Sequence, residues 1–219
     1  MSTAWPNLRN LEPQSRTFGL DRGAPIDRYY IENFLAAHAA DIRGRTLEVG
    51  DATYTHRFGG TRVSHADILH TPPGGRSATL VGDLATGQNI PRDTFDCIIL
   101  TQVLPFIFDV RAALAHAHAA LKPNGVILAT LPCISQISQY DMERWGDFWR
   151  FTTLSAQRLF EEAFVNGTVE VASHGNALAA TAFIQGMTTD DLTRAELDHH
   201  DPVYQLIVTV RAQRRGEEQ

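Results

Sequence analysis

A strand, a helix and a second strand near the middle of the chain constrain the fold most. Residues 96–100 (DCIIL) form a short, almost wholly apolar run, which predicts a strand covered on both faces. Residues 109–121 follow with apolar side chains on one helical face, and residues 126–131 (VILATL) predict another buried strand. A helical connection between two buried strands joins them in parallel with a right-handed crossover. The chain therefore predicts an α/β fold built on a parallel sheet.

The same alternation extends over most of the 219 residues. Periodicity predicts further strands at 46–50, 62–67, 78–82, 168–172 and 203–212, and helices at 25–38, 155–164 and 177–185. This number of elements predicts one doubly wound, mostly parallel sheet of seven strands with a Rossmann-like order. We expect two parts: residues 1–44 as an N-terminal arm with a helical lid, and residues 45–219 as the α/β domain.

Composition narrows the function classes. A formal net charge of −6 disfavours a general nucleic-acid partner, which needs clustered Lys and Arg. The longest apolar runs are too short to span a bilayer, and the first twenty residues lack the apolar core of a secretory signal, so we expect no membrane partner and a cytoplasmic location. The two cysteines, Cys97 and Cys133, are expected to be core residues, and no metal-site spacing is visible. Oligomeric state is not predicted.

The segment RTLEVGDATYTHRFGG at residues 45–60 raises the functional question. The first strand ends at Gly50, where a nucleotide-type loop brings bare backbone close to a ligand and usually carries more glycines. Here Asp51, Ala52 and Tyr54 follow, and the next strand begins soon after. The connection leaves room for one or two helical turns.

Acidic residues are predicted after the next two strands. Asp67 is expected at the end of the second strand, where a carboxylate can accept both hydroxyls of a ribose. Asp83 and Leu84 follow the third strand, where a carboxylate can bind the exocyclic amine of adenine and an apolar side chain can cover the ring. Each acid taken alone is more often a helix cap or part of a turn.

Taken in order, these motifs resemble the class I S-adenosylmethionine-dependent methyltransferases, and within them the small methyltransferase-domain group. The motifs are LEVG at 47–50, GDL at 82–84, DTFDCIILTQVL at 93–104, LKPNGVILATLP at 121–132 and DFWRFT at 147–152. The resemblance covers about residues 45–165. It implies an antiparallel last strand and S-adenosylmethionine as the cofactor.

The resemblance also implies roles for individual residues. Those implied at the cofactor are Glu48, Gly50, Thr101 and Gln102 at the methionine end, Asp67 at the ribose, and Asp83 and Leu84 at the adenine. The chain departs from the family pattern at Ala52 and Tyr54, which stand where the family has its second and third glycines. Many relatives carry a histidine after the fourth strand, but Pro105 and Phe106 stand here, so no catalytic base is identified.

Two further stretches have a structural and a functional interpretation. Arg28 and Tyr29 begin the lid helix and either close over the methionine carboxylate, compensating for the reduced glycine loop, or serve as a solvated charge and a core ring. Trp145, Trp149 and Arg150 follow the fifth strand, where methyl acceptors bind in this family. The alternative for Arg150 is an ion pair with Asp147 that braces a loop.

The function predicted from the sequence is S-adenosylmethionine-dependent methyl transfer to a small-molecule acceptor, with a hydroxyl oxygen of a sugar or secondary metabolite as the expected nucleophile. The alternative is a catalytically degenerate methyltransferase fold that binds an adenosyl ligand or a partner. A nicotinamide-dependent oxidoreductase is disfavoured because its dinucleotide loop needs three glycines in one turn.

Overall fold

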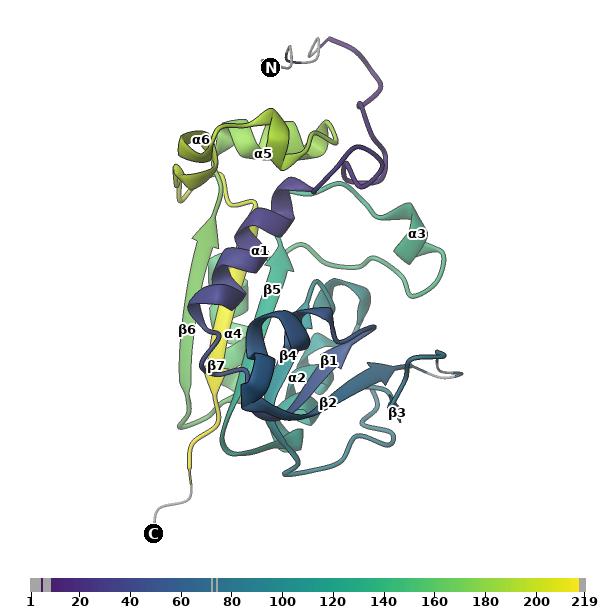
Figure 1. The fold of residues 1–219 in the computed structure, drawn as a ribbon, viewed down its shortest axis with the longest axis vertical. Helices are drawn as coiled ribbons and strands as arrows, with labels where there is room; N and C mark the ends of the chain where they lie inside the picture. Colours follow the sequence, from purple (N-terminus) through teal and green to yellow (C-terminus); the bar gives the residue numbers. More distant parts are fainter. Residues whose placement is uncertain (1–4, 6–8, 72, 74, 217–219) are drawn as a thin grey trace.

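The computed structural model describes residue 5 and residues 9–71, 73 and 75–216. Its centre is a seven-stranded sheet of order β3-β2-β1-β4-β5-β7-β6 (Figure 1). The strands are β1 Gly44–Val49, β2 Val63–His70, β3 Leu80–Val81, β4 Phe95–Thr101, β5 Leu121–Pro132, β6 Thr168–His174 and β7 Ile207–Gln213. β1 to β5 pair in parallel, whereas β7 lies antiparallel to both β5 and β6. The predicted α/β fold with an antiparallel last strand is confirmed.

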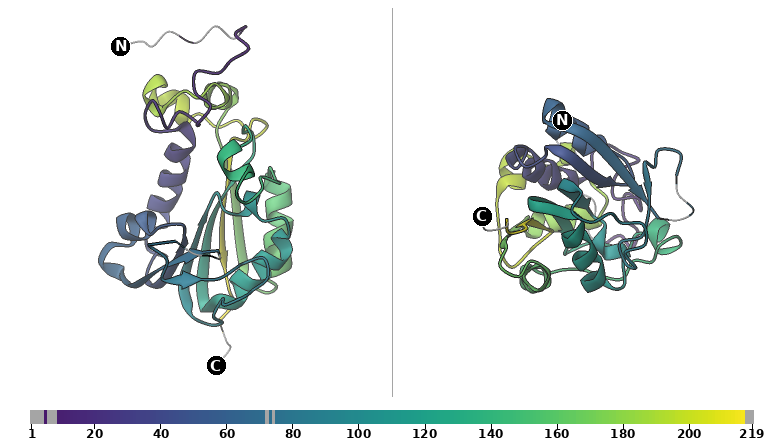
Figure 2. Two further views of the ribbon diagram at one scale, coloured as in Figure 1. Left: turned by 90° about the vertical axis from the view of Figure 1, so that its right-hand side faces the viewer. Right: turned by 90° about the horizontal axis from the view of Figure 1, so that it is seen from below.

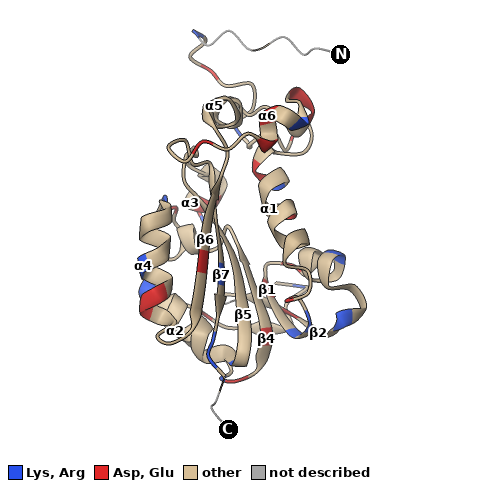
Figure 3. Cartoon of the chain, turned by 90° about the vertical axis from the view of Figure 1, so that its left-hand side faces the viewer, with Lys and Arg blue, Asp and Glu red and all other residues tan. Residues whose placement is uncertain are grey.

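Helices cover both faces of this sheet. Seen edge-on, α1 lies on one face and α2 and α4 lie on the other, while α5 and α6 sit beyond one end of the strands (Figures 2 and 3). The α-helices are α1 Ile26–Ala37, α2 Val110–Ala120, α3 Gln139–Met142, α4 Thr153–Ala163, α5 Ala177–Ile184 and α6 Arg194–Asp198. The single turns are η1 Thr55–Gly59, a π-helix, and three 3₁₀ turns, η2 Gly60–Arg62, η3 Leu104–Phe106 and η4 Thr189–Asp191.

Local sequence explains where three of the helices begin. Asp109, Thr152 and Asn176 precede α2, α4 and α5, and each side chain accepts a hydrogen bond from a backbone N–H in the first turn. Such a cap satisfies a donor that the helix itself leaves unpaired, and it is worth about 1 kcal/mol. These caps fix the ends of the loops that lead into α2, α4 and α5.

The helix predicted as a lid, α1, packs on the sheet. Ile31 and Leu35 of α1 are fully buried and belong to the same apolar cluster as Cys97, Ile99 and Leu128 of the sheet. Earlier in the helix, Ile26 and Tyr30 pack in a cluster with α5. α1 therefore crosses one face of the sheet, and its first turn reaches the carboxyl edge of the central strands. Burial raises the pKa of the Cys97 thiol, as expected for a core cysteine.

Three predicted strand boundaries were wrong by about three residues or more. β2 continues to His70 rather than ending at Asp67, because Ile68 and Leu69 extend its pairing with β1. β5 begins at Leu121, earlier than expected, and β7 begins at Ile207, later than expected. The short first crossover is confirmed, since η1 and η2 are the helical elements between β1 and β2. Among the described residues, no helix is both long and apolar enough to cross a membrane.

Candidate functional site

The strand order places a ligand-binding edge between β1 and β4. From β1 the chain continues outward through β2 and β3 on one side, while β4 and β5 extend the sheet on the other. In open parallel sheets, ligands bind beyond the carboxyl ends of the strands at such a switch point. Gly50 follows β1 there, and Thr101 and Gln102 lie at the end of β4.

A cavity of about 800 Å³ opens at this edge, and we call it the chamber. Its floor includes Thr101 and Gln102 at the end of β4 and Pro132 at the end of β5. Three other segments form its walls. They contribute Arg16, Thr17, Phe18 and Leu20 from the N-terminal arm, Pro25, Asp27 and Arg28 from the start of α1, and Ser135, Gln136, Ser138–Asp141, Glu143, Arg144, Asp147 and Arg150 from the segment after β5. Phe106, Phe183 and Ile207 complete much of its apolar lining.

The N-terminal arm forms a built turn over the chamber. Thr17 Oγ1 donates a hydrogen bond of 2.9 Å to the carboxylate of Asp21, and the Ser15 hydroxyl donates to the same oxygen. The backbone N–H of Gly19 donates to Ser15 Oγ at 3.1 Å. The hydrogen bonds from Ser15 and Thr17 lower the pKa of Asp21. The segment predicted as an irregular arm is therefore held in one conformation by its own side chains.

This turn is attached to the far end of the chain. The backbone N–H of Gln14 donates to the carbonyl of Gln185 at 2.8 Å, and the ring of Phe18 stacks on Phe183 with centroids 5.7 Å apart. Sequence reasoning missed these wall residues. The available signal was the close spacing of Ser, Thr, Gly and Asp in SRTFGLD, which is typical of a side-chain-stabilised turn.

The residues predicted on the acceptor side separate into two groups. Arg150 lines the chamber, but its guanidinium binds Asp147 with contacts of 2.5 and 2.9 Å. Burial acts to raise the pKa of Asp147, and the Arg150 and Ser138 hydrogen bonds outweigh it and lower that pKa. Trp145 and Trp149 are not among the residues lining the chamber, and the indole of Trp149 donates to the carbonyls of residues 107 and 108 at 3.2 Å.

Glu48 acts on the loop that follows β1. Its buried carboxylate accepts hydrogen bonds from the backbone N–H groups of Tyr54 at 3.2 Å and Thr55 at 2.8 Å. Burial raises the pKa of Glu48, while those N–H donors oppose the shift. The carboxylate thus fixes the start of η1. Tyr54 stacks its ring on Phe58 with centroids 6.0 Å apart.

Gly50 offers open backbone at the switch point. Its φ is +90°, and a Cβ built there would meet no other atom within 4 Å. Tyr54 therefore does not fill the space beside Gly50. The backbone N–H of Gly50 donates to the carbonyl of Leu69 at 3.0 Å, and Nε2 of His70 lies 2.7 Å from the Gly50 carbonyl oxygen. This is a position where a ligand can approach bare backbone closely.

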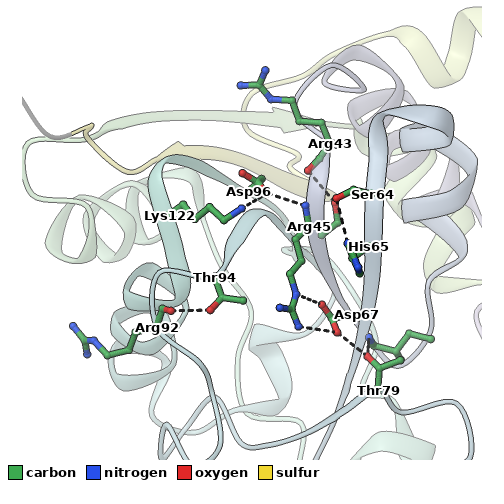
Figure 4. Close-up of polar contacts among 12 residues, drawn as sticks. Arg43, Arg45, Ser64, His65, Asp67, Thr79, Arg92, Thr94, Asp96 and Lys122 are labelled. Atoms are coloured by element: carbon green, nitrogen blue, oxygen red, sulfur yellow. Dashed lines mark hydrogen bonds and ion pairs between the residues drawn. The ribbon is translucent and has the colours of Figure 1, made fainter.

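Asp67 does not lie where the sequence analysis expected it. It pairs with Leu47 inside the sheet, three residues before the end of β2. Its carboxylate is bound by Arg45 Nε at 2.6 Å and by the Thr79 hydroxyl at 3.1 Å (Figure 4). The predicted strand boundary was wrong because the strand was ended too early, and the assignment of Asp67 to the ribose depended on that boundary. His70 is the residue at the end of β2, and the apolar pair before it was the signal that the strand continued.

The same close-up shows that Asp67 belongs to a brace between strands (Figure 4). The backbone N–H of Arg45 donates to Asp96 Oδ2 at 2.7 Å, and Lys122 Nζ lies 2.7 Å from the same oxygen. Arg45, Asp96 and Lys122 are each the second residue of β1, β4 and β5. The network therefore ties parallel strands together near their amino ends, opposite the chamber.

The predicted adenine contacts follow β3. Asp83 Oδ1 accepts from the N–H of Ala85 at 2.7 Å, and Oδ2 accepts from the Thr86 hydroxyl at 3.1 Å. A carboxylate has about four acceptor positions, so both oxygens keep capacity for a further donor. Leu84 is 3% exposed and belongs to the core cluster under α2, so its side chain packs inward.

Arg28 and Tyr29, the two site residues predicted at the start of α1, have side chains in different places. Arg28 lines the chamber, and its Nη1 lies 3.9 Å from Asp27 Oδ2. Tyr29 points elsewhere, since its hydroxyl donates to the carboxylate of Asp198 in α6 and its ring packs beside Tyr30. Arg28 therefore stays a candidate for a ligand carboxylate, whereas Tyr29 joins α1 to α6.

The residues at this edge fit an adenosyl amino-acid cofactor. Gly50 leaves space for close backbone approach, and Arg28 lines the adjoining chamber with a cation. A buried oxygen, Asp27 Oδ1, has no hydrogen-bond partner in the structure. Among the described residues, no group of three or more His, Cys, Asp or Glu is arranged to hold a metal ion.

Solved structures share this fold. An S-adenosylmethionine-dependent methyltransferase from Mesorhizobium loti superposes with a TM-score of 0.55 at 16% identity, covering 90% of this chain and 100% of that one. A SAM-dependent methyltransferase from Archaeoglobus fulgidus gives a TM-score of 0.54 at 10% identity, covering 85% and 94%. At these identities the likeness shows the fold.

Sequence comparison shows the family. No curated protein sequence matches the chain. A family model described as a methyltransferase domain matches residues 14–166, which is well over half of the 219 residues. The match includes residues 14–24 of the arm, α1, the loop after β1, and β4 and β5, whose ends border the chamber. The chain therefore belongs to the methyltransferase domain family, the class I enzymes that use S-adenosylmethionine.

Proposed function

We propose that this enzyme methylates a hydroxyl oxygen of a small molecule bound in the chamber. The observation that carries the proposal is the position of the chamber, which begins at Thr101 and Gln102 beside the switch point and extends over the end of β5. A methyl donor bound at the switch point and an acceptor in the chamber would then be neighbours. Such positioning is what a methyl transfer requires of the protein.

We further propose which residues hold the cofactor. The adenosine part would lie over β1, β2 and β3, with the ribose near His70 and the adenine amine at Asp83. The methionine part would lie between Gly50 and Thr101, with its carboxylate at Arg28, whose guanidinium can bind two oxygens in a fork. Gln102 and Glu48 would act by fixing the backbone around the cofactor. The backbone N–H of Gln102 donates to the carbonyl of residue 130 at 3.0 Å, and the Glu48 carboxylate fixes the start of η1. When bound, the cofactor supplies a methyl group made electrophilic by a sulfonium.

The size and cover of the chamber support a small acceptor. A volume of about 800 Å³ lies in the range of about 300–1,000 Å³ that is usual for small-molecule pockets. Phe18 and Leu20 of the N-terminal arm contribute to its walls, and the arm is hydrogen-bonded to the end of α5. A polymeric acceptor would have to displace this arm.

The lining supports an apolar acceptor over a free sugar. Apolar atoms form most of the exposed surface of the chamber, and Phe18, Pro105, Phe106 and Phe183 contribute to it. Sugars are usually bound by many polar side chains, whereas aromatic walls fit a ring system that carries few polar groups. Of the two acceptor types expected from the sequence, we therefore favour the secondary metabolite.

The test is a labelling experiment. The protein is incubated with S-adenosylmethionine carrying a labelled methyl group and a cell extract, and the products are separated by size. Label in the small-molecule fraction, in a product whose mass spectrum identifies a methyl ether, is the expected result. Label that appears only in protein or RNA would contradict the proposal. The Arg28→Ala variant, with weakened cofactor binding, is the matched control for background methylation.

A further inference from the structure

Asp27 stands out among the chamber residues because of its surroundings. It is 8% exposed, and its Oδ1 is buried without a hydrogen-bond partner. Its Oδ2 has an ionic contact with Arg28 at 3.9 Å, which is too long for a hydrogen bond. The Arg28 guanidinium and the backbone N–H groups of Arg28 and Asp27 act to lower the pKa of this carboxyl, but burial outweighs them, so Asp27 is an incompletely paired carboxylate whose burial costs stability.

Apart from Arg28, the other charged groups that face the chamber differ from Asp27 in having close partners. Arg150 is bound to Asp147, as described above. The remaining pairs are Arg16 with Glu12, Asp141 with the Ser138 hydroxyl, Glu143 with Gln139, and Arg144 with the Tyr140 carbonyl. The charge that acts on Asp27 comes from Arg28, and the charges of Asp27, Glu32 and Glu48 act to raise the pKa of the neighbouring Tyr54. Among the described carboxylates that line the chamber, Asp27 is therefore the one without a close side-chain partner.

The position of Asp27 is close to the switch point. It lines the chamber together with Thr101 and Gln102 of β4. The charge of Asp27 and that of Glu48 both act on the Tyr54 hydroxyl, so the first turn of α1 approaches the loop that follows β1. Burial raises the pKa of Asp27, and its place in the first turn of a helix favours the ionised form. A carboxylate in such surroundings can act as a base.

We propose that Asp27 accepts the proton from a neutral, hydroxylated aromatic acceptor bound in the chamber. As the acceptor oxygen forms its bond to the methyl carbon, the carbon–sulfur bond of the donor breaks and its electron pair stays on sulfur, leaving a neutral thioether. The O–H bond of the acceptor breaks at the same time, and its proton passes to the Asp27 carboxylate. This inference rests on the proposed function, since it requires an acceptor that carries a proton.

The experiment uses two probes that share a naphthalene ring: 2-naphthol and 2-naphthylmethylamine. Binding of each to the protein saturated with S-adenosylhomocysteine is measured by calorimetry. Single-turnover formation of 2-methoxynaphthalene from 2-naphthol and S-adenosylmethionine is measured between pH 5 and pH 9. The variants are Asp27→Asn, Asp27→Glu and Glu32→Gln, the last being an acid on the same helix that pairs with Arg57 outside the chamber.

We expect 2-naphthol to bind and to be methylated, with a rate that rises as Asp27 ionises. Asp27→Asn should lower that rate about 100-fold and remove the acid limb of the pH profile, while the affinities for S-adenosylhomocysteine and 2-naphthol change less than threefold. Asp27→Glu should restore part of the rate. Glu32→Gln should match the wild type. Unchanged cofactor affinity in Asp27→Asn also shows that the variant is folded.

Four results would overturn the inference. If the rate of Asp27→Asn is within threefold of the wild-type rate, Asp27 is not the base. Loss of S-adenosylhomocysteine binding without loss of 5′-methylthioadenosine binding would assign Asp27 to the cofactor ammonium. Preferred binding of the naphthylmethylamine would make Asp27 a receptor for cations. Absence of methylation with both ligands bound would exclude hydroxylated aromatics. If S-adenosylhomocysteine itself fails to bind the wild type, the proposed function fails instead.

Discussion

Nε2 of His70 lies 2.7 Å from the carbonyl oxygen of Gly50, and this contact joins the carboxyl ends of β1 and β2 at the ligand-binding edge. The imidazole is half-buried and retains a second ring nitrogen for a ligand. We predict that His70→Ala weakens binding of both S-adenosylhomocysteine and 5′-methylthioadenosine about fivefold or more, because both carry the ribose. Calorimetric titration with the two ligands measures this.

Asp67 provides the matched comparison for His70. Its carboxylate is engaged by Arg45 and Thr79 inside the sheet, three residues before the end of β2 (Figure 4). Asp67→Ala should therefore lower the free energy of unfolding by about 1 kcal/mol and leave both affinities within twofold. If Asp67→Ala instead weakened ligand binding more than His70→Ala, the ribose would belong to Asp67 and our placement would be wrong.

Arg28 is predicted to bind the amino-acid part of the cofactor. Arg28→Ala should weaken S-adenosylhomocysteine binding about tenfold or more, because the carboxylate loses a charge-assisted partner. Binding of 5′-methylthioadenosine, which has no such carboxylate, should barely change. Arg57→Ala is the control, since Arg57 pairs with Glu32 outside the chamber. Equal losses for both ligands would indicate a general defect, and no loss would return Arg28 to a solvent-exposed role.

Substitution of Gly50 should have two separable effects, one on stability and one on ligand binding. A side chain at φ +90° is strained, so Gly50→Ala should cost about 1 kcal/mol of unfolding free energy. The added methyl group would also occupy the space that we assign to the cofactor, and both adenosyl ligands should bind at least tenfold more weakly. Gly60 is a matched control, because it too has a positive φ and open space at its Cβ position. Gly60→Ala should show the strain without the loss of affinity; similar affinities for the two variants would contradict the site.

Asp27 should give the stability of the protein a recognisable pH dependence. Burial raises its pKa in the folded state above the ordinary value of 3.8, so the folded state holds this proton more tightly than the unfolded state. The contribution of Asp27 to stability is therefore present at low pH and is lost as the pH rises through the raised pKa. Asp27→Asn should melt about 3 °C above the wild type at pH 7, and the difference should vanish near pH 3.5.

Thermal denaturation across this pH range tests that prediction, with Glu32→Gln as the control. A constant difference at all pH values would show that Asn alters packing rather than charge. A wild type that is more stable than Asp27→Asn at pH 7 would show that the Asp27 carboxylate is well paired in the folded protein.

Local sequence patterns were sufficient to predict most strands of the sheet. Short runs of mainly apolar residues, such as the one that forms β4, predict a buried strand. The short crossover after Gly50 left no room for a long helix. The end of β2 was misplaced because Asp67 resembles a strand terminator. Arg45 of the neighbouring strand β1 binds that carboxylate, so the acid can lie inside the sheet.

The walls of the chamber could not be predicted because they depend on contacts between distant parts of the chain. Phe18 is fixed by Phe183, and nothing in the local sequence of either residue indicates the pairing. Trp149 was expected to face the acceptor, but it is held outside the chamber by the carbonyls of residues 107 and 108, and its ring packs beside Phe108. Asp27 has a local sequence typical of an ordinary helix start, and its burial appears only when α1 is placed on the sheet.

The central claim is that the cofactor lies at the β1–β4 switch point with its reactive end at the chamber. A crystal structure of the complex with S-adenosylhomocysteine tests this most directly. We predict that the ribose lies near His70, the carboxylate at Arg28, and the sulfur atom beside Thr101 with the Asp27 carboxylate on its chamber side. A sulfur atom enclosed away from the chamber, or a ligand bound at another edge of the sheet, would contradict it.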